Sequence, residues 1–159
     1  MEAAEALALK SLLERQPIAA LATLHGAEPA LSMVPFALLP ADARFVIHVS
    51  RLASHTNDML IDPAVALLVT ASLETADSPL SLARASVQGH AFPCAPTSPD
   101  YAAARAAYVT KLPQSEELFS FSDFSLFVVE VRAVRYVAGF GRAMSIGAER
   151  LAAILGGAA

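Results

Sequence analysis

Short apolar runs joined by tight turns are the feature that most limits how this chain can fold. Residues 18–24, 30–39 and 45–49 have the composition of strands, and segments 25–29 and 40–43 between them carry the glycine, proline and aspartate typical of turns. Such short connections join antiparallel neighbours, because a parallel pair needs a crossover of about a dozen residues or more. The N-terminal third of the chain therefore predicts an antiparallel meander.

The remaining sequence extends this pattern and places helices at its margins. Further strands are expected at residues 64–71, 82–92, 124–132 and 134–138. Helices are expected at residues 2–15, within 50–60, from Ser98 as cap to about 111, and at 147–155, with Leu7, Leu12 and Leu13 of the first as core contacts. Polar residues 73–81 and the glycine-flanked residues 139–143 are expected to be loops. Because an open meander leaves unpaired edges, the pattern favours a mainly β fold that closes into a barrel with flanking helices.

The length and composition indicate one domain that has more apolar residues than its own core needs. The chain has 159 residues, and we expect residues 1–159 to form a single domain. Hydrophobic residues make up 55% of the chain and charged residues only 16%, with a mean hydropathy of +0.51. This surplus exceeds what one small core needs and is suited to a buried subunit interface, so we expect a homodimer.

Several functional classes are disfavoured by the same composition. No apolar run reaches the roughly 18 residues of a membrane span, and the acidic N-terminus lacks the basic start of a signal peptide, so a cytoplasmic protein without a membrane partner is expected. A net charge of −4 without a basic run argues against a nucleic-acid partner. The lone Cys94 excludes an internal disulfide, and the four histidines lack metal-ligand spacing, so no metal site is predicted.

One polar segment, residues 50–56, stands out as a candidate binding site. It combines Ser50, Arg51, His55 and Thr56 at the expected start of a helix, where free N–H groups and a guanidinium attract an anion. The alternative is that Ser54 or Thr56 only caps the helix while Arg51 is solvated, and the sequence leaves both interpretations open. His48 and His90 lie on expected strands, where a hydrogen-bonded structural role is more common than metal ligation.

Several of these segments together resemble one known protein family. The residues that carry it are Ala20–Leu24, Pro29–Phe36, Phe45–Met59, Val87–Gly89, Asp123–Phe127 and Val137–Ala143. They resemble, in order and with few gaps over about residues 5 to 145, the pyridoxamine 5′-phosphate oxidase-related split barrels, in particular the haem-utilisation branch. The resemblance implies a six-stranded antiparallel split β-barrel of the FMN-binding type, which dimerises and holds FMN in clefts at the dimer interface.

The resemblance also implies roles for individual residues. The implied cofactor-binding residues are Ser32, Met33, Val34, His48, Ser50, Arg51, His55, Thr56, Asn57, Gln88 and Arg142. Residues 32–34 would flank the flavin ring, the 50–57 segment would meet the phosphate, Gln88 would hydrogen-bond the flavin, and Arg142 would approach cofactor or substrate. A flavin needs a flat slot, a few donors and an anion site, which these segments can supply. No catalytic residue is identified.

Two departures from the family pattern keep three functions open. Asn57 stands where close relatives carry a basic residue, and no histidine follows His90, so haem ligation by a C-terminal histidine is absent. The first hypothesis is an FMN-dependent oxidoreductase acting on an unidentified small molecule. The alternatives are a non-catalytic flavin- or haem-binding barrel and a dimeric barrel without cofactor.

Overall fold

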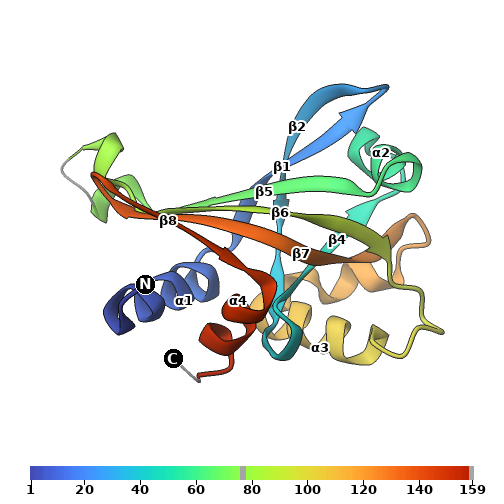
Figure 1. The fold of residues 1–159 in the computed structure, drawn as a ribbon. Coiled ribbons are helices and arrows are strands. Elements are labelled where there is room, and N and C mark those ends of the chain that lie inside the picture. The colour runs from blue at the N-terminus through green and yellow to red at the C-terminus, as the bar shows by residue number, and fades with distance from the viewer. Residues whose placement is uncertain (76–77, 158–159) are drawn as a thin grey trace.

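A computed structural model describes residues 1–75 and 78–157, and its arrangement is drawn in Figure 1. The part of the expected 73–81 loop at residues 76–77 lies outside the described residues. The strands are β1 (Ile18–His25), β2 (Glu28–Pro35), β3 (Ala37–Leu39), β4 (Arg44–Ser50), β5 (Ala64–Thr70), β6 (Arg84–Pro93), β7 (Phe124–Gly139) and β8 (Arg142–Gly147). The helices are α1 (Ala3–Arg15), α2 (Ser54–Ile61), α3 (Tyr101–Lys111) and α4 (Ala148–Leu155), and the 3-10 turns are η1 (Pro40–Asp42), η2 (Leu73–Thr75), η3 (Pro79–Ser81) and η4 (Pro113–Ser120).

The described strands form one antiparallel sheet that the chain itself bends into a barrel. The order is β2-β1-β5-β6-β7-β4-β3, with β8 paired to β7. β2 and β3 lie at opposite ends of this order, yet only Phe36 separates them in sequence. The backbone therefore joins the two ends of the sheet, and β2 also contacts β4. The expected mainly β fold with flanking helices and antiparallel pairing is confirmed.

The number of strands is a correction, because the described residues form eight strands rather than six. The expected strand at 30–39 is divided at Phe36, where the chain bends across the barrel. The expected strands at 124–132 and 134–138 are one long strand, β7, because Ala133 pairs with Gln88 on one side and Gly147 on the other. The glycine loop at 139–143 is a tight hairpin that leads into an additional strand, β8.

A bulge between β6 and β7 shapes the middle of the sheet. Gln88 pairs with Ala133 and Gly89 pairs with Val131, so Arg132 is the extra residue. A Cβ atom at Gly89 would clash with the backbone carbonyl oxygen of Glu130, and glycine is therefore required for this close approach. The bulge places Arg132 on the exposed face of the sheet.

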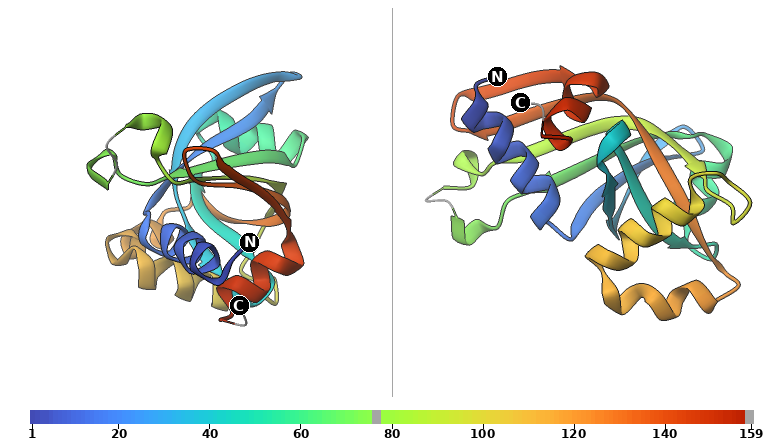
Figure 2. Two further views of the ribbon diagram at one scale, coloured as in Figure 1. Left: turned by 60° about the vertical axis from the view of Figure 1, so that its left-hand side comes forward. Right: turned by 90° about the horizontal axis from the view of Figure 1, so that it is seen from below.

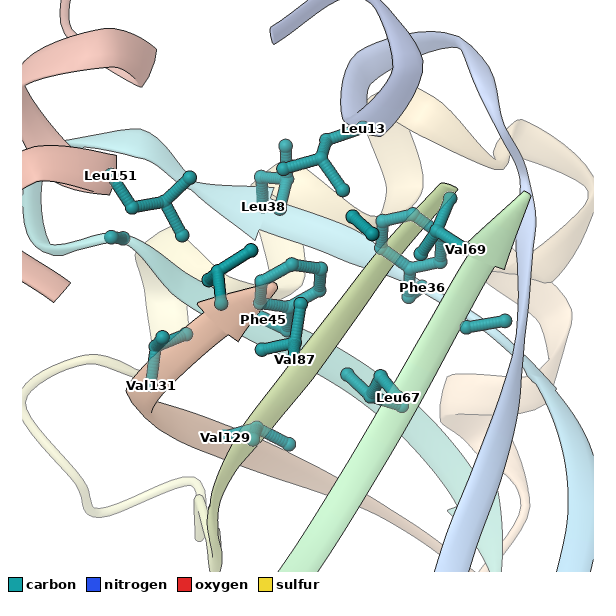
Figure 3. Close-up of a cluster of buried hydrophobic side chains, with 14 of the residues drawn as sticks. Leu13, Phe36, Leu38, Phe45, Leu67, Val69, Val87, Val129, Val131 and Leu151 are labelled. Carbon is teal, nitrogen blue, oxygen red and sulfur yellow. The ribbon is translucent and has the colours of Figure 1, made fainter. Parts of the chain in front are cut away.

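The inner face of the sheet is covered by helices, while much of the outer face is open. Figure 2 shows α1, α3 and α4 on the same side of the long strands. In Figure 3, side chains from α1, α4 and the strands converge on Phe36 and Phe45, which are fully buried. Leu12 and Leu13 join this core as expected, but Leu7 is exposed, and Ala6 and Leu9 occupy the inward positions of α1.

A second, smaller core lies between β4 and α3. Val46, Tyr108 and Leu126 belong to it, whereas Phe45 and Ile47 on the other face of β4 belong to the main core. β4 is thus buried on both faces, which agrees with its nearly continuous apolar sequence.

The N-terminus of α3 differs from the expected cap. The helix begins at Tyr101 with Asp100 rather than Ser98 as cap residue, and no side chain makes the cap hydrogen bond. The Asp100 carboxylate instead accepts two hydrogen bonds from Arg44, at 2.6 and 3.2 Å. None of the helices within residues 1–75 and 78–157 is long and apolar enough to cross a membrane.

Replacing the bulge glycine should destabilise the fold. We expect Gly89→Ala to lower the free energy of unfolding by about 1–3 kcal/mol, because β6 and β7 must separate to admit the methyl group. Urea unfolding followed by circular dichroism measures this change. Ser86→Ala, at an exposed position of the same strand, is the control and should change stability by about 0.5 kcal/mol or less. Equal stabilities for the two variants would contradict the close approach.

Candidate functional site

The open face of the sheet carries a cavity of about 400 Å³ with an alanine-rich floor. It is lined by Ala22, Thr23, Leu24, Pro29, Ala64, Val65, Ala66, Gln88, Gly89, His90 and Arg132. Ala22 on β1 pairs directly with Ala66 on β5, and Ala64 lies two residues before Ala66 on the same face of β5. Because alanine projects only a methyl group, this floor is flat, and the volume is in the usual range for small-molecule sites.

Polar groups gather at the β6–β7 side of this cavity. Gln88 and His90 are two residues apart on β6 and share the outer face, and the bulge adds Arg132 beside them. Arg132 donates a hydrogen bond to Nδ1 of His90, over 3.3 Å. Because arginine can only donate, Nδ1 of the neutral ring is the acceptor and its proton is on Nε2. The cavity thus combines an amide, an imidazole and a guanidinium with an apolar floor.

The apolar surface continues beyond the cavity along the outer face. Leu31, directly across from Ala22, is 79% exposed, and Met33 across from Ala20 is 60% exposed. Ile18, Leu68 and Phe92 are also large, apolar and exposed. Exposed apolar patches rimmed by polar residues are typical of interaction surfaces, so this face is a candidate for one.

The predicted β2 residues divide between the two faces of the strand. Met33 points outward next to the apolar floor, while Val34 is buried in the main core. The Ser32 hydroxyl is buried without a hydrogen-bond partner among the described residues. Gln88 is the predicted residue that the structure places in the cavity.

The predicted anion site at residues 50–57 is internally bonded. Ser50 Oγ donates to the Asp123 carboxylate over 2.9 Å, and the Arg51 guanidinium donates to the Ser122 carbonyl. Thr56 Oγ1 donates to the Ser50 carbonyl over 2.6 Å and is buried. The cap of α2 is Ala53, so neither hydroxyl that was considered as a cap makes the cap hydrogen bond. Asp123 introduces a negative charge where a phosphate was predicted.

The other polar residues of α2 differ in exposure. Asn57 is exposed, and His55 is half-buried. Burial lowers the pKa of His55, partly opposed by the nearby Asp58 charge. The short helix therefore offers an amide and a mostly neutral imidazole, which is a weak set of donors for a dianion.

Two other predicted residues lie away from the cavity. His48 is buried in the second core, where its ring stacks on Phe119 with 3.9 Å between centroids. Arg142 forms an ion pair with Glu5 and lies 3.8 Å from Glu2, so it ties β8 to the start of α1. Neither residue lines the 400 Å³ cavity.

A buried carboxylate, not singled out from the sequence, fastens α2 to the β1–β2 hairpin. Asp58 accepts hydrogen bonds from Thr23 Oγ1 at 2.9 Å and from His25 Nδ1 at 2.7 Å. The His25 hydrogen bond, with the Thr23 hydroxyl, holds the pKa of Asp58 below its usual value. Because Thr23 also lines the cavity, this contact fixes one wall of the site.

His90, Arg132 and Asp58 are the site residues that sequence reasoning missed. A glycine inside a strand pattern is typical of a bulge, and the two-residue spacing of Gln88 and His90 places them on one face. Those two signals, taken together, would have predicted a polar cluster beside Gly89, but they were not combined. No local signal connects Asp58 with residues 23 and 25, which are more than 30 positions earlier.

Comparison with known proteins identifies the family. The sequence profile of the family described as pyridoxamine 5′-phosphate oxidase matches residues 7–138, most of the chain. The chain belongs to the pyridoxamine 5′-phosphate oxidase family. The resemblance noted in the sequence is therefore confirmed, together with the split-barrel fold.

Two proteins similar to this chain have names that refer to haem, and a third supports the fold. The non-canonical haem oxygenase HOZ of Arabidopsis thaliana chloroplasts is 36% identical over 115 residues, which is 72% of this chain and 33% of that protein. The haem binding protein of Mycobacterium smegmatis has a TM-score of 0.84 and 31% identity, covering 96% of this chain and 61% of that one. ChuZ of Campylobacter jejuni has a TM-score of 0.80 at 20% identity, covering 92% and 61%, and supports the fold alone. The chain spans about a third of its curated relative.

The Asp58 contacts should make stability depend on pH. A carboxylate whose pKa is lowered on folding stabilises the fold above its unfolded pKa, near 4, and this stability is lost as the pH falls through the folded pKa. We expect Asp58→Asn to lower the urea midpoint at pH 7 and to reduce its loss between about pH 5 and pH 3. Glu117→Gln, at an exposed carboxylate, is the control and should keep the wild-type pH profile. An unchanged profile for Asp58→Asn would rule out this contribution.

Proposed function

We propose that this protein binds haem on the outer face of its sheet, within a homodimer. The observation that carries the proposal is the flat alanine floor bordered by His90 and Arg132. Haem is a flat apolar ring with two carboxylates at one edge, and it is held by an apolar surface, an axial ligand and a cation. The names of the relatives at 36% and 31% identity give this ligand further support.

The residues of the cavity fit the chemistry of haem. Ala22, Ala64 and Ala66 offer a surface that a planar ring can approach closely, and exposed Leu31 stands beside it. His90 supplies an imidazole, and Arg132 a planar charged donor suited to a carboxylate. Bound haem would supply an iron that accepts axial ligands and carries out redox chemistry.

The hydrogen bond between Arg132 and His90 would have to change when iron is ligated. In the free protein Nδ1 accepts from Arg132, so the proton of the neutral ring is on Nε2. Ligation through Nε2 requires this proton on Nδ1, which then can no longer accept from a guanidinium. Arg132 would thereby be released and could pair with a carboxylate of the ligand. The two residues would then act together, one on the metal and one on the ring edge.

FMN is the second candidate, and Gln88 favours it. A side-chain amide in the cavity offers both a donor and an acceptor to the polar edge of a flavin, as the family resemblance implied. The phosphate fits less well, because Ser50 and Arg51 are bonded within the protein beside the Asp123 carboxylate. An oxidoreductase acting on a small molecule through FMN is accordingly the weaker proposal, and a barrel without cofactor the third.

The apolar outer face supports the proposed dimer. Leu31, Met33, Leu68 and Phe92 are exposed in one chain and lie on the same side of the sheet as the cavity. A second copy of the chain is the occupant we propose, because these large apolar side chains are exposed around the cavity and a symmetric dimer would bury the same face of both copies. A ligand in the cavity would then be enclosed between two subunits.

Haem titration tests the ligand. We expect the purified protein to bind haemin with a shifted Soret band, and His90→Ala to lose this shift and to weaken binding about tenfold or more. Arg132→Ala should weaken binding about two- to tenfold, the range for one charge-assisted hydrogen bond at an exposed site. His55→Gln, at a half-buried histidine that does not line the cavity, should keep the wild-type spectrum.

Metal-free protoporphyrin separates the two roles. Without iron, His90→Ala should have little effect on affinity, while the effect of Arg132→Ala should persist. Haemin binding that is equal in wild type and His90→Ala would contradict the axial role. Absence of haemin binding together with retained FMN would favour the second candidate, and absence of both would favour the third.

Light scattering tests the dimer. We expect a mass twice that of the 16.6 kDa chain at micromolar concentration. Introducing charge with Leu31→Asp and Met33→Asp should give a folded monomer, because the buried carboxylates would lose hydration. Leu7→Asp, on an exposed residue of α1, is the matched control and should remain dimeric. A monomeric wild type would contradict the proposed interface.

A further inference from the structure

A second cavity, of about 190 Å³, lies in the smaller core at the opposite side of β4 from the main core. It shares no lining residue with the cavity on the outer face. Its walls come from β4, the segment after β6, the start of α3, η4 and the start of β7. The inference drawn from it does not depend on the haem proposal.

His48 gives this cavity its chemical character. The side chain is more than nine-tenths buried, lines the cavity, and has no hydrogen-bond partner for Nδ1 among the described residues. Burial lowers the pKa of His48 to about 4, so the imidazole is neutral near pH 7. A neutral imidazole has one nitrogen that accepts and one that donates. A buried polar atom without a partner costs stability, and a ligand that supplies the partner recovers it.

The rest of the cavity wall is mostly apolar, with three aromatic rings, and carries no charged side chain among the described residues. The rings of Phe119 and Phe124 lie 3.9 and 5.2 Å from the His48 ring, measured between centroids. Tyr101 and Ser125 contribute hydroxyl groups. No aspartate, glutamate, lysine or arginine is found among the described residues that line the cavity. The wall therefore selects against an ion and in favour of a flat, neutral molecule.

We propose that this cavity is a binding site for a small neutral aromatic alcohol, a single ring of the phenol class whose hydroxyl hydrogen-bonds to His48. The size agrees, since an apolar cavity of about 150 Å³ in another protein takes up benzene. The ring would contact the aromatic wall, and the hydroxyl would satisfy the imidazole. The ligand would also connect η4 and the start of α3 to β4, and so stabilise the smaller core.

Calorimetric titration of the full chain with phenol and with benzene tests the proposal. Phenol should bind about three- to tenfold more tightly than benzene, the effect of one net hydrogen bond. His48→Phe replaces the imidazole by an apolar ring and should lose or reverse the preference for phenol, because a buried hydroxyl without a partner costs free energy, while remaining folded by circular dichroism. A preference for phenol that persists in His48→Phe would overturn the proposal, as would a wild type that binds neither ligand.

A second pair of variants locates the site without altering His48. Ser125→Leu adds side-chain volume to the cavity wall and should weaken phenol binding at least tenfold. Gln88→Leu alters the outer-face cavity instead and should keep the wild-type phenol affinity. The opposite result, loss in Gln88→Leu and none in a folded Ser125→Leu, would place phenol on the outer face and overturn the assignment.

Discussion

The close approach of β6 and β7 at Gly89 is the constraint on which the rest of the structure depends. Without a side chain at that position, the carbonyl of Glu130 can lie against the β6 backbone, and the register shifts by one residue. The extra residue, Arg132, is thereby directed to the outer face next to His90. The absence of a side chain at Gly89 therefore permits the bulge between β6 and β7, and the bulge in turn places Arg132 in the candidate site.

The apolar residues on the two faces of the sheet differ in how they are covered. The inner face is covered by α1 and α4, whose leucines and isoleucine reach Phe45 and its neighbours. Within the described residues, no helix lies over the alanine floor of the outer face, and its large apolar residues stay exposed in the single chain. Alanine at the centre and leucine or methionine at the side leave a shallow recess, which a second subunit would turn into an enclosed slot.

The fold could be predicted further from the sequence than the site could. Apolar runs and turn residues gave the antiparallel barrel and most strands, because local periodicity decides those elements. β8 was missed because it is short and mostly exposed, although Met144 and Ile146 alternate toward the core and Gly141, with φ of +75°, suits a tight hairpin. The binding role of residues 50–57 was inferred from their residue types at an expected helix start and from the family resemblance. Their partners, Ser122 and Asp123, lie about 70 positions later, and no local pattern reveals them.

The four histidines show why residue type alone does not assign function. His25 donates to a buried carboxylate and serves to hold α2, while His55 lies half-buried near the same charge. His48 is buried at the smaller core, and its Nδ1 has no hydrogen-bond partner among the described residues. His90 remains at the edge of an apolar cavity, with its tautomer set by Arg132. The four imidazoles have the same intrinsic chemistry, and their roles differ because their neighbours differ. The contacts of each ring decide whether it positions a helix, as His25 does, lacks a hydrogen-bond partner, as His48 does, or lines a cavity, as His90 does.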